Sequence, residues 1–216
     1  MQQQIVLATN NAKKLVELRR IVAEHPSVRD GRVDVEVLGL SDVQSYPEPA
    51  ETERSFEGNA LIKARACVAV TGLPALADDS GLAVEELNGM PGVRSARWSG
   101  PDATDEANNE LLLRQLDDLP DGRRGAKFIS VVAFVLPDGR EFLRHGEMPG
   151  RLLRELRGDN GFGYDPMFVP DGFDLSTGQL PSDQKDAISH RGKAVRAVVD
   201  VIMDEFTRTA ETGERS

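Results

Sequence analysis

The chain has 216 residues, with 26 Lys and Arg against 36 Asp and Glu, so its formal net charge is −10. This length predicts one domain over residues 1–216, with a disordered tail from about residue 205, and it can bury a core without disulfides or a structural metal. The charge argues against nucleic acid or a membrane as a partner, although a few local cations can still bind a small anion. One cysteine, no apolar run of about 20 residues and no signal-peptide pattern predict a cytoplasmic protein.

The first half of the chain alternates predicted strands and helices. A short buried strand at 4–9 precedes a helix whose apolar face carries Leu15, Leu18, Ile21 and Val22. Alternating valines predict a half-buried strand at 33–37, and a Pro- and Glu-rich loop follows at 43–52. A helix over 56–70 ends at Gly72, and a short strand at 76–77 runs into an acidic turn.

The second half adds a helix over 105–116 and a hairpin. The two strands of the hairpin, 128–136 and 140–147, flank the turn Pro137-Asp138-Gly139. A short strand at 164–169 and a long helical stretch at 182–209, interrupted at Gly192, complete the chain. Alternation followed by a hairpin predicts an α/β fold with a mixed sheet flanked by helices.

The segment Thr9-Asn10-Asn11-Ala12-Lys13-Lys14 lies where a strand ends and a helix begins. Asn is a favourable N-cap, and the first backbone N–H groups of a helix can bind an anion. Thr9 and Asn11 add side-chain donors, and Lys14 adds a positive charge one turn later. Taken alone, the same residues are more simply explained as a capped helix with two surface lysines, and they are not a Walker A loop.

Paired carboxylates follow the strand at 76–77. Along an extended chain successive side chains point to opposite faces, so one of Asp78 and Asp79 can enter a cleft while its neighbour does not. Such carboxylates at a strand's carboxyl end suit Mg²⁺ together with substrate phosphates, although an Asp-rich turn before Ser80 and Gly81 is the simpler alternative. Nearby, Glu51 precedes a helix on which Asn59 and Lys63 share one face.

Two further motifs lie in the second half. Gly161-Phe162-Gly163-Tyr164-Asp165 combines two glycines with two aromatic rings that could stack on a nucleobase or could simply anchor a loop. Lys185 precedes the adjacent His190 and Arg191 at the interruption of the last helix, where Arg offers only donors. No spacing of the three histidines predicts a zinc site.

Taken together, these motifs resemble the inosine triphosphate pyrophosphatase family, which acts on dITP, ITP and XTP. The resemblance rests on Thr9–Lys14, Asn59–Ala64, the long segment Ala77–Trp98, and Phe162–Asp165 with Ser189–Gly192. It spans about residues 4 to 203. It implies a mixed sheet whose two lobes enclose a nucleotide cleft, a Mg²⁺ cofactor and a homodimer.

The resemblance also assigns a role to each motif. Asp79 is expected to be the catalytic base and, with Glu51, a metal ligand; Glu53 or Glu57 could replace Glu51 because this loop aligns least clearly. The expected substrate-binding residues are Thr9, Asn10, Asn11, Ala12, Lys13, Lys14, Lys63, Ser80, Phe162, Gly163, Tyr164, Asp165, Lys185, His190 and Arg191. The implied reaction is hydrolysis of a non-standard purine nucleoside triphosphate to the monophosphate and pyrophosphate. A pyrophosphatase for other nucleotides such as dUTP, or a nucleotide sensor without turnover, remains the alternative.

Overall fold

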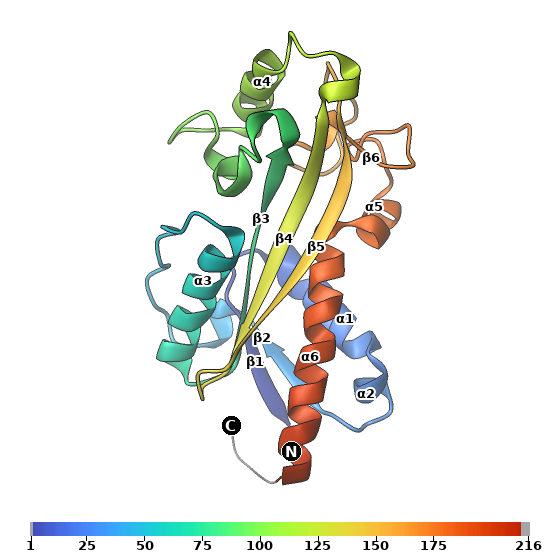
Figure 1. Ribbon diagram of the computed structural model, residues 1–216. Coiled ribbons are helices and arrows are strands. Elements are labelled where there is room, and N and C mark those ends of the chain that lie inside the picture. Colours follow the sequence, from blue (N-terminus) through green and yellow to red (C-terminus); the bar gives the residue numbers. More distant parts are fainter. Residues whose placement is uncertain (1, 213–216) are drawn as a thin grey trace. The chain divides into compact units, whose positions relative to one another are not determined.

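Six strands form one sheet in the computed structural model, which describes residues 2–212 and their side chains through residue 209. The sheet order is β2-β1-β3-β4-β5-β6 (Figure 1). The strands are β1 (Gln3–Leu7), β2 (Val35–Leu38), β3 (Ala75–Val84), β4 (Gly125–Val135), β5 (Glu141–Leu152) and β6 (Phe168–Pro170). β1 pairs with β2 and β3 in parallel, whereas β5 and β6 are antiparallel, so the predicted mixed α/β sheet is confirmed.

Six α-helices accompany these strands within the described part of the chain. They are α1 (Ala12–Glu24), α2 (Pro26–Arg29), α3 (Phe56–Thr71), α4 (Asp105–Gln115), α5 (Ser182–Ile188) and α6 (His190–Thr212). Local sequence sets several of their ends. Asn11 caps α1 by accepting from the backbone N–H groups of Lys13 and Lys14, and Ser55 caps α3. Gly72 ends α3 in the left-handed conformation, at φ 68°.

The chain contacts divide the molecule into two compact units. Unit 1 comprises the residues up to Asp79, Val131–His145 and the chain from Ala194 onward. Unit 2 comprises Ser80–Ser130 and Gly146–Lys193. Strands β3, β4 and β5 each contribute residues to both units.

Unit 1 buries apolar side chains on both faces of its part of the sheet. Leu76 of β3 packs in a cluster with residues of α1 and α6, whereas Ala75 and Ala77 pack in a second cluster with residues of α3. In Figure 1, α3 lies on one side of these strands and α1 and α6 lie on the other. This alternation along β3 fixes which face each following side chain meets.

Unit 2 has its own core around α4 and the adjoining strand segments. Leu112 and Leu116 of α4 pack with Phe128 of β4 and Phe168 of β6. Arg124 is the largest side chain buried in this unit, at 2% exposure, and it donates to the backbone carbonyls of three residues: Leu116, Leu152 and Leu153. These bonds satisfy a buried guanidinium without a carboxylate partner among them.

Two expectations about the strands were wrong. Asp78 and Asp79 do not form a turn but lie inside the ten-residue strand β3, because both are buried against partners from distant segments. The predicted strand at 164–169 is confined to residues 168–170, since Pro166 sits in a short 3-10 helix over Asp165–Met167.

The interruption of the last helix falls at Ser189 and not at Gly192. Ser189 is extended, with ψ 140°, and its Oγ accepts from the backbone N–H of Gly192 at 2.9 Å, which caps the first turn of α6. A disordered tail was expected from about residue 205, but residues through Thr212 belong to α6 and Phe206 is buried. Residues 213–216 of that expected tail lie outside the described residues.

Candidate active site

Asp79 is the centre of a polar cluster in unit 1. Its side chain lies on the α3 face of β3, in phase with Ala75 and Ala77, and the residue is only 9% exposed. Nδ2 of the fully buried Asn59 donates to Asp79 Oδ2 at 3.0 Å, and Lys63 Nζ lies 4.0 Å from Asp79 Oδ1. The predicted face of α3 therefore meets this carboxylate, with Asn59 and Lys63 one turn apart.

Glu51 joins the same cluster through the ammonium group of Lys63. Lys63 Nζ donates to Glu51 Oε1 at 2.9 Å, so two carboxylates share one cation. Asn59 ties the loop in place as well, because its Oδ1 accepts from the backbone N–H of Glu53 at 3.0 Å. The carboxylate of Glu57 lies instead 3.6 Å from Nδ1 of His145. Of the three glutamates considered, Glu51 is the one whose carboxylate meets Lys63.

Asp78 points to the opposite face of β3, as the strand alternation predicts. Its Oδ2 accepts from Lys14 Nζ of α1 at 2.7 Å, and its side chain is nearly fully buried. The neighbouring acids thus have different cations, Lys14 for Asp78 and Lys63 for Asp79. Because each carboxylate faces a separate helix, the two can serve different purposes.

The segment Thr9–Lys14 forms a turn that is largely closed by its own hydrogen bonds. Thr9 Oγ1 accepts from the backbone N–H of Asn11 at 3.2 Å, and Asn11 Oδ1 accepts from those of Lys13 and Lys14 at 3.0 and 3.4 Å. The cap therefore occupies backbone groups that an anion would otherwise use. The ammonium groups and exposed side chains of this segment, including Ala12 at the first helical position, are what it can present to a ligand.

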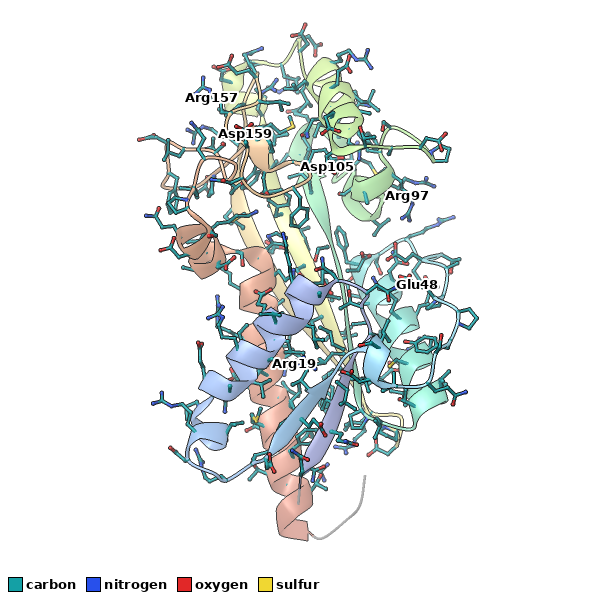
Figure 2. The ribbon with its side chains drawn as sticks, turned by 180° about the vertical axis from the view of Figure 1, so that it is seen from behind. Arg19, Glu48, Arg97, Asp105, Arg157 and Asp159 are labelled. Atoms are coloured by element: carbon teal, nitrogen blue, oxygen red, sulfur yellow. The ribbon has the colours of Figure 1, made fainter. Side chains whose placement is uncertain are left out.

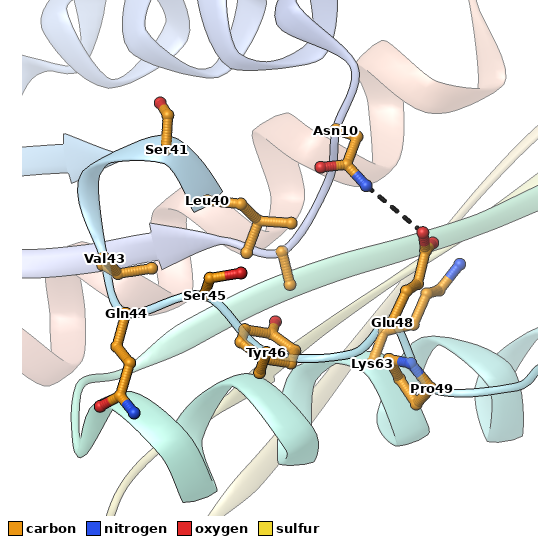
Figure 3. Close-up of a pocket in the computed structure, with 11 residues that line it drawn as sticks. Asn10, Leu40, Ser41, Val43, Gln44, Ser45, Tyr46, Glu48, Pro49 and Lys63 are labelled. Carbon is orange, nitrogen blue, oxygen red and sulfur yellow. Dashed lines mark hydrogen bonds between the residues drawn. The ribbon is translucent and has the colours of Figure 1, made fainter.

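A pocket of about 370 Å³ opens beside this segment within unit 1. Asn10 and Lys63, two predicted substrate-binding residues, both line it, and Asn10 Nδ2 donates to Glu48 at 3.3 Å across it (Figure 3). Burial, and secondarily Cys67, raise the pKa of the Tyr46 hydroxyl in the wall of the pocket, so Tyr46 remains a neutral donor. The sequence had indicated only a loop for this wall.

Unit 2 carries the remaining predicted residues. Ser80 follows Asp79 on β3, and its hydroxyl hydrogen-bonds to that of the buried Ser130 on β4 at 2.8 Å. His190, the first residue of α6, stacks on Phe128 with ring centroids 5.0 Å apart and an angle of 11° between the rings. Arg191 follows His190 and is half-buried.

The loop from Gly161 to Asp165 presents an aromatic ring. Phe162 is 73% exposed, while Asp165 is buried beneath it, accepts from the backbone N–H of Phe162 at 2.8 Å and pairs with Lys185. Lys185 Nζ also lies 5.4 Å from the centre of the Phe162 ring. Gly161 has φ +84°, and a Cβ there would come within 2.0 Å of Asp165 Oδ2, so this turn requires glycine.

Tyr164 anchors the same loop from below. Its hydroxyl donates to the backbone carbonyl of Ser95 at 2.9 Å. Burial, with a smaller contribution from the negative Asp105, raises the pKa of Tyr164 well above its usual range, so it stays a hydrogen-bond donor. The two aromatic residues of the motif therefore differ: Tyr164 holds the loop, and Phe162 is open to a ligand.

The structure brings Glu51, Lys63 and Asp79 together in unit 1 and Phe162, Asp165 and Lys185 together in unit 2, and it adds further contacts. Ser130 beside Ser80, and Asp105 and Asn109 beside Gly163, were not among the expected residues. Asn59 was expected on the same helix face as Lys63, but without a role of its own, and its bond to Asp79 was not expected. The i, i+4 spacing of Asp105 and Asn109 on one helix was the available signal for these two residues. The other contacts join segments far apart in sequence.

A carboxylate beside a lysine is a pair of groups that can bind metal and phosphate, and an exposed aromatic ring can stack on a base. The α/β fold with these groups fits the class of enzymes that hydrolyse nucleotides.

Comparison with known proteins gives the family. Residues 5–201 match the model of the Ham1 family. The chain is 58% identical over 201 residues to a dITP/XTP pyrophosphatase of Cutibacterium acnes, covering 92% of this chain and 96% of the relative. A solved structure from Mycobacterium abscessus, described as a nucleoside-triphosphatase / dITP/XTP pyrophosphatase, is 50% identical with a TM-score of 0.77, covering 91% of this chain and 98% of that one. The Ham1 protein of Staphylococcus aureus is 35% identical with a TM-score of 0.84, over 94% of this chain and 100% of that one.

The chain therefore belongs to the Ham1 family, which confirms the resemblance drawn from its motifs.

Proposed function

We propose that this protein hydrolyses non-standard purine nucleoside triphosphates, namely dITP, ITP and XTP, to the monophosphate and pyrophosphate, and so removes them from the nucleotide pool. The names of its relatives support this substrate class. The observation that carries the chemistry is the buried Asp79 carboxylate, held by Asn59 and facing Lys63.

Mg²⁺ is the proposed cofactor, held by Glu51 and Asp79. Both carboxylates approach the same ammonium group of Lys63, so together they already form a site for positive charge. Among the described residues, no three His, Cys, Asp or Glu side chains are grouped to hold a metal ion. A site with two carboxylates fits Mg²⁺, which commonly takes its other ligands from water and substrate phosphates. When bound, the ion would neutralise phosphate charge and make a water molecule more acidic.

The residues of unit 1 would act on the phosphates. Asp79 would accept the proton of the attacking water, and its bond from Asn59 Nδ2 would fix the direction of the carboxylate. Lys14 and Lys63 would donate to the triphosphate, since each is an ammonium group held in place by a carboxylate. Thr9 and the residues 10–13 would line this phosphate end.

The residues of unit 2 would bind the base. Phe162 would stack on the purine, with Gly163, Tyr164, Asp165 and Lys185 building its loop. His190 and Arg191 would face the base edge, and Ser80 would contact the substrate. Arginine has donors only, so it would favour the 6-oxo group of hypoxanthine and xanthine over the 6-amino group of adenine. Arg191 alone would not reject guanine, which also carries a 6-oxo group.

We further propose that the protein is a cytoplasmic homodimer, as the family resemblance implies. Within the part of the chain that the structure describes, no helix has the length and apolar character needed to cross a membrane. Light scattering of the purified protein measures the assembly directly, and a mass of one chain would contradict the dimer.

The function is tested with a panel of nucleoside triphosphates and Mg²⁺, assayed separately for pyrophosphate and for inorganic phosphate. We expect dITP, ITP and XTP to yield pyrophosphate and monophosphate far faster than ATP, GTP or dUTP. Release of inorganic phosphate would indicate stepwise removal of terminal phosphates and contradict the proposal. Preference for dUTP would indicate a different substrate class, and binding of ITP without products would indicate a sensor.

A further inference from the structure

Both backbone polar groups of Gly163 are held by side chains of α4. The N–H of Gly163 donates to Asp105 Oδ2 at 2.6 Å, and Asn109 Nδ2 donates to the carbonyl of Gly163 at 2.8 Å. The two side chains are one turn apart on the helix, and Asp105 lies at its first turn (Figure 2). Gly163 directly follows the exposed Phe162. The two hydrogen bonds from α4 therefore hold the loop at the residue next to its exposed aromatic ring.

The side-chain amide of Asn109 is held in one orientation by its hydrogen bonds. Its Nδ2 donates to two carbonyls, those of Asp105 and Gly163, each at 2.8 Å, so the orientation of the amide is fixed by its partners. Asn109 is 3% exposed, and its Oδ1 is buried with no hydrogen-bond partner among the described residues. A buried acceptor left without a partner is unfavourable, so the favourable contacts of this side chain are the two hydrogen bonds that its NH₂ group donates.

We propose that Asp105 and Asn109 are positioning residues for nucleobase binding. They hold Gly163, and through it the ring of Phe162, in the geometry that accepts the base. This inference rests on the proposed function and extends it to α4, from which no substrate contact was expected. Neither residue needs to touch the substrate. A loop released from α4 must be ordered again on each binding event, so the base part of the ligand loses affinity.

The test separates the base from the phosphates. The variants are Asp105→Ala and Asn109→Ala, with Asp105→Asn as the conservative change, since its side-chain oxygen can still accept from Gly163. Glu110→Ala is the matched control, because Glu110 lies on the same helix, is 71% exposed and pairs only with Arg114 among the ion pairs of α4. Inhibition constants are measured for inosine monophosphate, which carries the base, and for pyrophosphate, which does not.

We expect each alanine variant to weaken inhibition by inosine monophosphate about five- to tenfold, the size of a lost side-chain hydrogen bond to a backbone group. KM for ITP should rise by a similar factor, whereas kcat and inhibition by pyrophosphate should change by less than about twofold, since an interaction that is weakened equally in the ground and transition states affects KM alone. Asp105→Asn should stay within about threefold of wild type, and Glu110→Ala should not differ from it.

A purely structural role gives a different pattern. It would lower the melting temperature and the active fraction, and would leave both inhibition constants unchanged in the folded enzyme; that result overturns the inference. Equal weakening of monophosphate and pyrophosphate overturns it too. If Asn109→Ala does not fold, the inhibition constants of Asp105→Ala and Asp105→Asn provide the test, because Asp105 is exposed. If wild-type enzyme releases no pyrophosphate from ITP, the proposed function fails and this inference fails with it.

Discussion

Replacing Asp79 by Asn tests the centre of the site with almost no change of shape. The carboxylate accepts from Asn59 Nδ2 through Oδ2, and its Oδ1 lies 4.0 Å from Lys63 Nζ. An amide has only one oxygen. If that oxygen keeps the bond from Asn59, the new NH₂ group is directed toward the lysine, where a donor meets a cation. The substitution therefore removes the base, a ligand for the metal and the attraction for Lys63 together.

The expected loss of activity is larger than the expected loss of stability. A positioned general base alone contributes about 100-fold or more, which corresponds to about 2.7 kcal/mol of activation free energy. The fold loses one charge-assisted hydrogen bond and retains a neutral one, a difference of about 1 kcal/mol in the free energy of unfolding. We expect turnover of ITP at saturating Mg²⁺ to fall at least 100-fold, about the loss of a general base, while the circular dichroism spectrum stays unchanged.

Asp78→Asn is the matched control. The two acids are adjacent and similarly buried, but Asp78 faces Lys14 on the opposite side of the strand. We expect this change to raise KM by loosening Lys14 and to reduce kcat far less than Asp79→Asn does. The assignment of Asp79 is refuted if its variant retains more than about a tenth of the wild-type rate, a loss too small for a general base.

Four further outcomes are expected. Lys14→Ala should raise KM for ITP more than the inhibition constant of the monophosphate, because an ammonium contact to phosphate contributes about 1.5–3 kcal/mol; equal effects would place Lys14 away from the two outer phosphates. Arg191→Ala should lower kcat/KM for ITP more than for ATP, and equal losses for ITP, ATP and GTP would contradict its proposed role at the base. Arg124→Met should lower the free energy of unfolding by about 3–5 kcal/mol in urea titrations, since three backbone carbonyls lose their donor, and a change below about 1 kcal/mol would show that other groups satisfy them. Burial raises the pKa of the Cys67 thiol, so less thiolate is present at any given pH. Iodoacetamide should therefore modify Cys67 slowly in the native protein at pH about 8, near the usual thiol pKa, and rapidly in urea. Fast modification of the native protein would be inconsistent with this burial.

Sequence alone was sufficient where the cause is local. The cap at Asn11 and the left-handed end at Gly72 depend on one side chain or on its absence, so composition at a single position predicts them. The opposite directions of Asp78 and Asp79 follow from the two-residue period of an extended chain, and their separate partners, Lys14 and Asn59, confirm it.

Tertiary structure decided what depends on distant partners. Asp-Asp-Ser-Gly has the composition of a turn, yet it continues a strand, because Lys14 and Asn59 reach the two acids from 64 and 20 residues away. The hydrogen bond from the N–H of Gly163 to Asp105 joins residues that are 58 positions apart in the sequence. Such contacts form only when the core brings their elements together, and a single sequence carries no direct record of that distance. The motifs therefore identified the candidate functional side chains, and only the fold determined which other residues hold those side chains in place.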